Sequence, residues 1–396
     1  MNQSNKPETE DFSIVLGGPF FQLLRRSRLT GDSLQLLHWR MIILPMVAWL
    51  PLLVLSALEG HALGKSVPVP FLLDVAAHVR FLVALPLLIL SELVVHQRMR
   101  PVVQQFRERH LISAPDSDRF DGAVASSFRL RNSMVVEAML LVLVFVVGTQ
   151  LVWKHSVAVS TATWYAMPGD EGLKLSFAGM WYCFLSLPIF QFLLLRWYFR
   201  LFVWGRFLWQ VSRIDLSLMP THPDRMGGLG FLSRTAYAFV PLALAHGAML
   251  SGLLATRILY LGAALPQFKA EIALLVVIVL GVVLGPLLVF VPQLARVKRT
   301  GIREYGQLAE RYVREFESKW LRGQAPADEP FIGSGDIQSL ADLGGSFDVV
   351  REMRPILVSK EAVLLLVAST LLPIAPLLLT MMPMEELLRK LVGILL

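Results

Sequence analysis

Residues 272–291 read IALLVVIVLGVVLGPLLVFV, and this stretch decides the fold class. It contains no charged residue. An α-helix needs about 20 apolar residues to cross the hydrocarbon core of a bilayer, because each residue adds about 1.5 Å. The stretch therefore predicts a transmembrane helix, and the rest of the chain contains more stretches of the same kind.

Six other stretches resemble it, so the chain is predicted to have seven spans. The other six are residues 41–58, 75–95, 134–153, 177–195, 236–256 and 362–382. A chain of 396 residues that is 55% hydrophobic and 17% charged is too apolar for a soluble protein of this length. We therefore expect an all-α, polytopic helical membrane protein. The last stretch contains Pro373 and Pro376, so a re-entrant segment is the alternative there.

The predicted chain has four parts. Residues 1–40 form an N-terminal segment in which residues 12–24 are typical of an interfacial helix. Residues 41–295 hold the first six spans. Residues 296–360 carry apolar side chains at helical spacing, which predicts that the sixth span continues beyond the membrane and that a second helix follows Gly333-Ser334-Gly335. Residues 361–396 hold the seventh span and an amphipathic tail.

The distribution of basic residues predicts the orientation of the chain. Of the 37 lysines and arginines, 29 lie in residues 1–40, 97–133, 196–237 and 296–360. These four segments fall on one side of a seven-span protein, and basic connections face the cytoplasm. We therefore expect a cytoplasmic N-terminus. The arginines that follow the fourth span, Arg196 to Arg213, stand among aromatic residues and are expected to snorkel to the membrane surface.

The charge and the single cysteine restrict the partners. A net charge of +7 on a membrane protein indicates contact with anionic lipids of the inner leaflet, and no basic run with interleaved aromatics suggests nucleic acid. Cys183 alone cannot form a disulfide framework or a cysteine metal site. No pattern in the sequence predicts a metal or a cofactor. A homo-oligomer and a cytoplasmic protein partner for residues 296–360 are both compatible with the sequence.

The densest group of chemically active side chains follows the fourth span. Residues 221–232 read THPDRMGGLGFL, in which His222, Asp224 and Arg225 precede Gly227 and Gly228. Glycines before a helix leave backbone amides accessible, and with Arg225 beside them these amides suit a phosphate or another anion. In the alternative, structural interpretation, Asp224 caps the helix, Arg225 meets lipid phosphate and the glycines permit tight packing.

Two strings in the chain also resemble those of a known group of proteins. HPDRxGGLGFL at residues 222–232 and DIQSLADLxxSF at residues 336–347 are similar to signatures of an uncharacterised family of multipass bacterial inner-membrane proteins. The resemblance covers most of the chain after the first span. It implies a location in the bacterial inner membrane and brings no activity with it.

Three ionisable residues fall inside predicted spans. Glu92 and Glu137 lie at similar depth in the second and third spans, and His246 lies near the middle of the fifth. Such residues are costly in lipid and by default are candidates for function, here a polar path through the membrane. The alternative is that each glutamate pairs with an arginine of residues 97–133 and that His246 bonds a neighbouring helix.

Asp336, Ser339 and Asp342 form a third candidate group. Their spacing of three places them along one face of the second extramembrane helix. They would either approach Arg225 or His222, bind a divalent ion, or form a solvated face. No established metal-ligand spacing is present, so no metal site is predicted.

Three functions are compatible with these residues. The first is a channel or transporter for an ion or small polar solute, with a polar site on the cytoplasmic side. The second is a membrane enzyme that acts on a lipid head group or phosphate at the inner surface, with His222 as base, Asp224 orienting it and Arg225 binding the anion. The third is a non-catalytic scaffold or sensor that binds a partner through residues 296–360.

Overall fold

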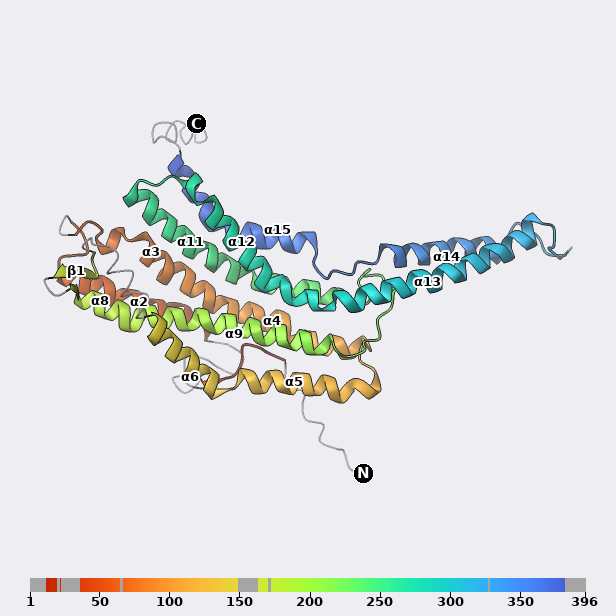
Figure 1. The fold of residues 1–396 in the computed structure, drawn as a ribbon, viewed down its shortest axis with the longest axis horizontal. Helices are drawn as coiled ribbons and strands as arrows, with labels where there is room; N and C mark the ends of the chain where they lie inside the picture. The colour runs from red at the N-terminus through yellow and green to blue at the C-terminus, as the bar shows by residue number, and fades with distance from the viewer. Residues whose placement is uncertain are drawn as a thin grey trace, which may run out of the picture.

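The structure is a computed structural model that describes residues 12–19, 22, 36–64, 67–148, 163–169, 172–326 and 328–381. Long helices lie side by side along the longest axis of the molecule, and one helical hairpin projects beyond an end of the bundle (Figure 1). The described part of the chain is mostly helical, and its regular strands are confined to one short β-hairpin. The expected all-α class is therefore confirmed.

Six described helices are long and apolar enough to cross a membrane, some of them interrupted by single turns of π or 3-10 helix. Their bounds are Leu37–Leu58, Val75–Glu108, Phe177–Val211, Gly230–Tyr260, Leu265–Leu321 and Lys360–Met381. In order, their α-helical parts are α2 (Leu37–Leu58), α3 (Val75–His78), α4 (Leu85–Glu108), α8 (Phe177–Trp181), α9 (Leu187–Val211), α10 (Gly230–Ser233), α11 (Val240–Leu261), α12 (Lys269–Leu284), α13 (Val291–Phe316) and α15 (Lys360–Leu371).

The predicted count of seven spans is not confirmed. The third predicted span begins as α6 (Met134–Leu143) and continues through a π-helical turn, Val144–Gly148. Its apolar helical part, Met134–Val146, is shorter than the other six. The rest of the predicted span lies outside the described residues. The membrane character of the chain therefore rests on six helices.

Apolar side chains cover both the inside and the outside of the bundle. Phe106, Trp204 and Phe207 are fully buried where α4 and α9 pack together, while Phe202, on another face of α9, is 60% exposed. The outer faces of α12 and α15 likewise expose Val277 and Leu364. A surface of this kind is unfavourable in water and matches the hydrocarbon of a bilayer.

The region after the sixth span forms a helical hairpin, as predicted. α13 extends the sixth span without a break, and α14 (Gly335–Glu352) returns beside it (Figure 1). The Tyr312 hydroxyl donates to the Asp336 carbonyl oxygen at 3.1 Å across the two helices. We call residues 296–352 the arm.

Residues 12–15, near the N-terminus, are buried. Residues 12–15 lie among α4, α9 and α5 (Ser117–Arg131), where the Phe12 ring packs against Phe128 and Phe207 at centroid distances of 5.8 and 4.8 Å. This part of the predicted interfacial segment therefore packs between helices, because aromatic side chains of the bundle cover the Phe12 ring.

The opposite end of the bundle carries the β-hairpin, β1 (Ala166–Gly169) and β2 (Gly172–Leu175), paired antiparallel with Ala166 opposite Leu175. Pro168 and Gly169 are the last residues of β1. Trp164 anchors the hairpin, since its indole nitrogen donates to Asp74 Oδ2 at 2.9 Å.

Candidate functional site

The motif loop, which we define as residues 219–229, is organised by the carboxylate of Asp224. This carboxylate accepts hydrogen bonds from the backbone amides of Met226 at 2.7 Å, Gly228 at 3.2 Å and Gly230 at 2.9 Å. Gly230 begins α10, so Asp224 serves the helix start, as in the structural interpretation. Of the glycine amides expected to receive an anion, those of Gly228 and Gly230 already have an acceptor.

These hydrogen bonds affect the acidity of Asp224. Partial burial raises the pKa of the carboxyl, but the amides of Met226, Gly230 and Gly228 and the nearby His222 together lower it below its ordinary value. His222 Nδ1 lies 2.9 Å from Asp224 Oδ1. The same Nδ1 accepts a hydrogen bond from the Asp224 backbone amide at 3.2 Å, so the pair lacks the Nδ1–H donation to a carboxylate on which an Asp–His acid-base arrangement depends.

Arg225, Gly227 and Gly228 connect the loop to other elements. Arg225 adopts a φ of +54° and pairs with Glu352 of α14 at 2.7 Å, while its carbonyl oxygen accepts from the Arg354 amide. Gly227 has a φ of +66°, and a Cβ there would lie 3.1 Å from Met353. These residues therefore hold the base of the arm against the bundle, and Arg225 is occupied by Glu352.

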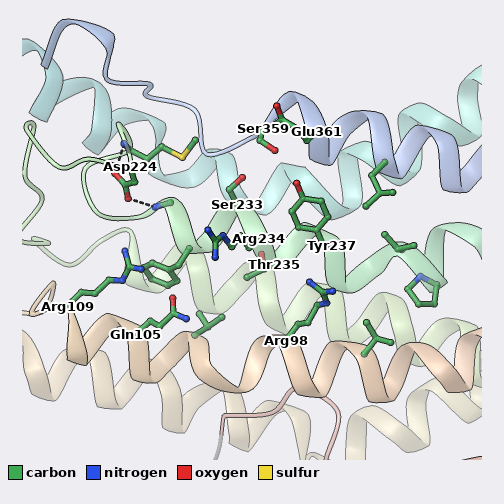
Figure 2. A pocket seen from close by; sticks show the side chains of 18 residues that line it. Arg98, Gln105, Arg109, Asp224, Ser233, Arg234, Thr235, Tyr237, Ser359 and Glu361 are labelled. Carbon is green, nitrogen blue, oxygen red and sulfur yellow. Dashed lines mark hydrogen bonds between the residues drawn. The ribbon is translucent and has the colours of Figure 1, made fainter. Parts of the chain in front are cut away.

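A large pocket lies beside the motif loop, and we call it the arginine pocket. Its volume is about 1000 Å³. Figure 2 shows that α4 forms one wall, the start of the fifth span another, and the start of α15 a third. Its polar lining residues are Arg98, Gln105, Arg109, Asp224, Ser233, Arg234, Thr235, Tyr237, Ser359 and Glu361.

Three arginines bring positive charge to this pocket. Arg109 is fixed, since its guanidinium donates to the Gly228 carbonyl oxygen at 3.2 Å and lies 5.1 Å from the centre of the Phe231 ring. Arg98 extends from α4 toward the helix that carries Arg234 (Figure 2). Within the described residues, the side chains of Arg98 and Arg234 have no hydrogen-bond or ion-pair partner.

The pocket wall changes from polar to apolar along its depth. On α4 the lining runs from Arg109 and Gln105 through Val102 and Arg98 to Val94, so its last residue toward the interior is apolar. On the fifth span it passes from Arg234 to Pro241. On α15 it passes from Glu361 to Leu365. All three walls thus become apolar toward the interior of the bundle, where each helix enters its membrane-spanning part.

Glu92 and Glu137 belong to a closed network of buried ion pairs. Glu92, 3% exposed, receives hydrogen bonds from Arg40 at 2.6 Å and Arg200 at 2.8 Å. Arg196 lies 3.9 Å from Glu92 and 3.5 Å from Glu137. The partners of Glu92 come from α2 and α9, so its expected pairing with an arginine of residues 97–133 is wrong.

The same network corrects the prediction for two arginines of the fourth span. Arg196 and Arg200 were expected to snorkel to the surface, but each is 4% exposed. Their side chains turn inward because Glu92 provides a charged acceptor inside the bundle, which lipid cannot do. Arg213 and Trp209 remain exposed and stack at 5.3 Å, as expected of a residue at the membrane surface.

His246 is also bonded within the bundle. Its Nδ1 lies 2.7 Å from the Leu242 carbonyl oxygen, which can only accept, so Nδ1 carries the proton. The neutral ring then accepts at Nε2 from the Tyr198 hydroxyl, 2.7 Å away. The bond to a neighbouring helix that was one alternative from the sequence is present.

Asp336, Ser339 and Asp342 lie on the arm. Hydrogen bonds from Lys319 and Trp320, both at 2.8 Å, lower the pKa of Asp336. Asp342 accepts from Gln338 of its own helix. Asp336 is at the opposite end of α14 from Glu352, about 24 Å away by helical rise, so it does not join Arg225. Among the described residues no group of three or more potential ligands could hold a metal.

Sequence reasoning did not find Arg98, Arg234 or Glu361 as site residues. Arg98 was visible only as one of seven arginines in a basic connection. Its partners in the pocket lie more than a hundred residues further along the chain, and no local spacing signals such a convergence. Asp224 was found, because its dipeptide context and the following glycines are local signals.

Comparisons of the chain with protein-family models, curated proteins and solved structures give no match. The resemblance of residues 222–232 and 336–347 to a family of bacterial inner-membrane proteins therefore stays a prediction.

Proposed function

We propose that this multipass membrane protein binds an anionic, phosphate-bearing ligand in the arginine pocket. The observation that supports the proposal is the convergence of Arg98, Arg109 and Arg234 on one pocket: in the described structure none of the three guanidinium groups has an acidic partner, and only that of Arg109 has a hydrogen-bond partner. A guanidinium presents several donors in a fixed plane and matches the oxygen atoms of phosphate.

The depth profile of the pocket favours an amphiphilic ligand. An anionic head group would meet Arg98 and Arg234, and an apolar portion would lie against Val94, Pro241 and Leu365. The distribution of lysine and arginine puts this end of the bundle at the cytoplasmic face. The ligand would then enter from the inner leaflet or from the cytoplasm.

One binding experiment with three ligands distinguishes a lipid head group from a free phosphate. The purified full chain would be titrated with dioleoylphosphatidylglycerol in mixed micelles, with glycerol 3-phosphate, and with inorganic phosphate. Binding of the lipid alone identifies an amphiphile, and binding of all three shows that phosphate is sufficient. If none of them binds, the proposal is wrong.

Variants test whether the pocket is responsible. Each charge-assisted hydrogen bond contributes about 1.5–3 kcal/mol, so Arg98→Gln and Arg234→Gln are each expected to raise Kd roughly tenfold or more. Arg311→Gln removes an exposed charge from the arm and serves as the matched control. Equal affinities for the three variants and the unmodified chain would contradict the assignment of the site.

The channel or transporter suggested by the sequence stays a prediction. Glu92, Glu137 and His246 motivated it, and each has a partner inside the bundle. Ion flux in proteoliposomes, compared among the unmodified chain, His246→Ala and Glu137→Gln, tests this function directly. Flux that stays at background in all three preparations would exclude it.

The enzyme hypothesis shares its ligand chemistry with the proposal above. Of the residues that the enzyme hypothesis assigns to catalysis, Asp224 lines the arginine pocket and His222 does not. Loss of ligand turnover in His222→Ala, with ligand binding retained, would favour an enzyme over a binding protein.

A further inference from the structure

A second hollow lies on the lipid-facing side of the bundle, between the fourth and sixth spans. One part, of about 670 Å³, is bounded by residues of α9 and α12. A second part, of about 590 Å³, is bounded by the end of α9 and the start of α13. Trp209 lines both parts, so they are neighbouring sections of one groove, which we call the α9–α12 groove.

The two sections differ in chemistry. The section toward the basic end of the bundle contains Arg213, Arg296 and Ser212, together with one carboxylate, Asp215. The section further into the span is apolar except for Arg206 at its edge. Like the arginine pocket, the groove is basic near the membrane surface and apolar toward the membrane interior.

Glycines give the apolar section its depth. A Cβ added to Gly281 or to Gly285 would meet no atom within 4 Å, so both residues face open space. On the other side, Gly205 approaches the ring of Pro286 closely enough that a Cβ would be 3.5 Å from it. The floor is therefore lined by backbone and small side chains, and it accommodates an extended chain.

At one end of the apolar section lies Tyr198, whose hydroxyl bonds His246. Tyr198 and Leu201 line both the apolar section and a space of about 10 Å³ beside His246. A space of that size is at the lower limit for one water molecule. A ligand in the groove would therefore end at the Tyr198–His246 hydrogen bond.

We propose that the α9–α12 groove binds an anionic glycerophospholipid. Its phosphate would lie between Arg213 and Arg296, and one acyl chain would lie along Gly205, Gly281 and Gly285. Phe202 and Trp209, 60% and 50% exposed, stand in the groove on its lipid-facing side. This site is separate from the arginine pocket and does not depend on the function proposed for it.

Charge argues for a lipid over a second copy of the chain. Gly281 and Gly285 have the spacing of residues that permit close helix contact. A symmetric pairing through this groove, however, would bring Arg206, Arg213 and Arg296 of one copy near the same arginines of the other. Their mutual repulsion is removed when a phosphate occupies the site.

Photo-crosslinking with mapped peptides tests the proposal. The full chain in nanodiscs would be exposed to phosphatidylglycerol and to phosphatidylcholine that carry the same photoreactive acyl chain. We expect labelling of peptides that contain residues 198–209 and 281–296, with phosphatidylglycerol exceeding phosphatidylcholine. Peptides around Arg98 and Arg234 report the arginine pocket separately, so failure at one site is distinguishable from failure at the other.

Two kinds of variant separate the parts of the site. Gly281→Leu places a side chain in the apolar section from a position whose Cβ meets no other atom of the chain, and it should abolish groove labelling by both lipids. Arg213→Gln combined with Arg296→Gln should leave labelling but remove the preference for phosphatidylglycerol. Val277→Leu enlarges an exposed side chain of α12 outside the groove lining and should change neither result.

Three outcomes would overturn the proposal. The first is equal labelling by the two lipids in the unmodified chain. The second is groove labelling that persists in Gly281→Leu. The third is crosslinking between two copies of the chain through residues 281–285, which would show that protein fills the groove.

Discussion

Glu92 is the residue on which three spans converge. Its carboxylate bonds Arg40 of α2 and Arg200 of α9, while Arg196 continues the network to Glu137 of α6. The Arg40 side chain is fully buried, and its Nε and NH1 atoms have no hydrogen-bond partner among the residues that the structure describes. With these donors unsatisfied, the ion pair with Glu92 is what compensates the buried charge of Arg40.

Substitution of Glu92 should therefore destabilise the bundle strongly. Glu92→Gln keeps the shape and removes the charge, which leaves Arg40 and Arg200 buried without a carboxylate. Breaking a buried pair in this way costs about 3–5 kcal/mol. We expect a lower Tm for thermal unfolding in detergent. The control is Glu271→Gln, which removes an exposed ion pair with Arg257 and should change the Tm little. A Tm equal to that of the unmodified chain would show that the network does not stabilise the fold.

Asp224 gives the motif loop a dependence on pH. Its pKa is lowered in the folded chain, so its ionised form stabilises the loop at neutral pH. This contribution is complete above the ordinary value of 3.8 and is lost as pH falls through the lowered folded pKa. Hydrogen exchange of the Met226 and Gly230 amides, corrected for the intrinsic rate, should therefore accelerate as the pH falls through the lowered pKa of Asp224.

The control for this prediction is Asp224→Asn, which has one acceptor oxygen in place of two. Amide exchange in this variant should already be fast at neutral pH, and it should show no added acceleration in acid. An identical pH profile in the two chains would mean that another group governs the loop.

At the scale of elements, the fifth span and α15 approach each other very closely. A Cβ on Gly247 of α11 would lie 2.0 Å from the carbonyl oxygen of Thr370, which is backbone and cannot move aside. Small residues at such positions let membrane helices pack through direct backbone contact. The contact places α15, and with it Ser359 and Glu361, at the wall of the arginine pocket.

Enlarging Gly247 should separate these two helices. Gly247→Val is expected to destabilise the bundle by at least about 1–3 kcal/mol, the usual cost of overpacking, and to weaken ligand binding in the arginine pocket. Gly281→Ala is the matched control, since a Cβ there meets nothing. Thermal unfolding of both variants checks the prediction, and equal Tm values would contradict it.

At the scale of the whole molecule, charge is unevenly distributed between the two ends. The arm and the arginine-rich connections lie at one end of the bundle, and the β-hairpin lies at the other (Figure 1). The positive-inside rule assigns the arm to the cytoplasm. This orientation is a prediction about the protein in its membrane.

Cysteine labelling tests the orientation. Cys183 is the only cysteine and is buried, so Cys183→Ser provides a background without thiols. Lys174→Cys on β2 should react with an impermeant maleimide added to intact cells, whereas Ser318→Cys on the arm should react only after the membrane is opened. The reverse pattern would invert the proposed topology and place the arginine pocket outside.

The sequence by itself determined the membrane class, the positions of six long apolar helices and the helical hairpin of the arm. These features depend on local signals: length, hydrophobicity and the spacing of apolar residues. The role of Asp224 in the motif loop was also accessible, because its partners lie within six residues of it.

Only the tertiary structure decided where the charges lie. Arg196 and Arg200 pair with Glu92, and Arg98 shares a pocket with Arg234, although these residues are far apart in the chain. Whether an arginine at the end of a span faces lipid or the bundle depends on the rotation of its helix and on a carboxylate from another helix. Local hydrophobicity carries no information about either, so the ion-pair network, the arginine pocket and the groove emerged from packing alone.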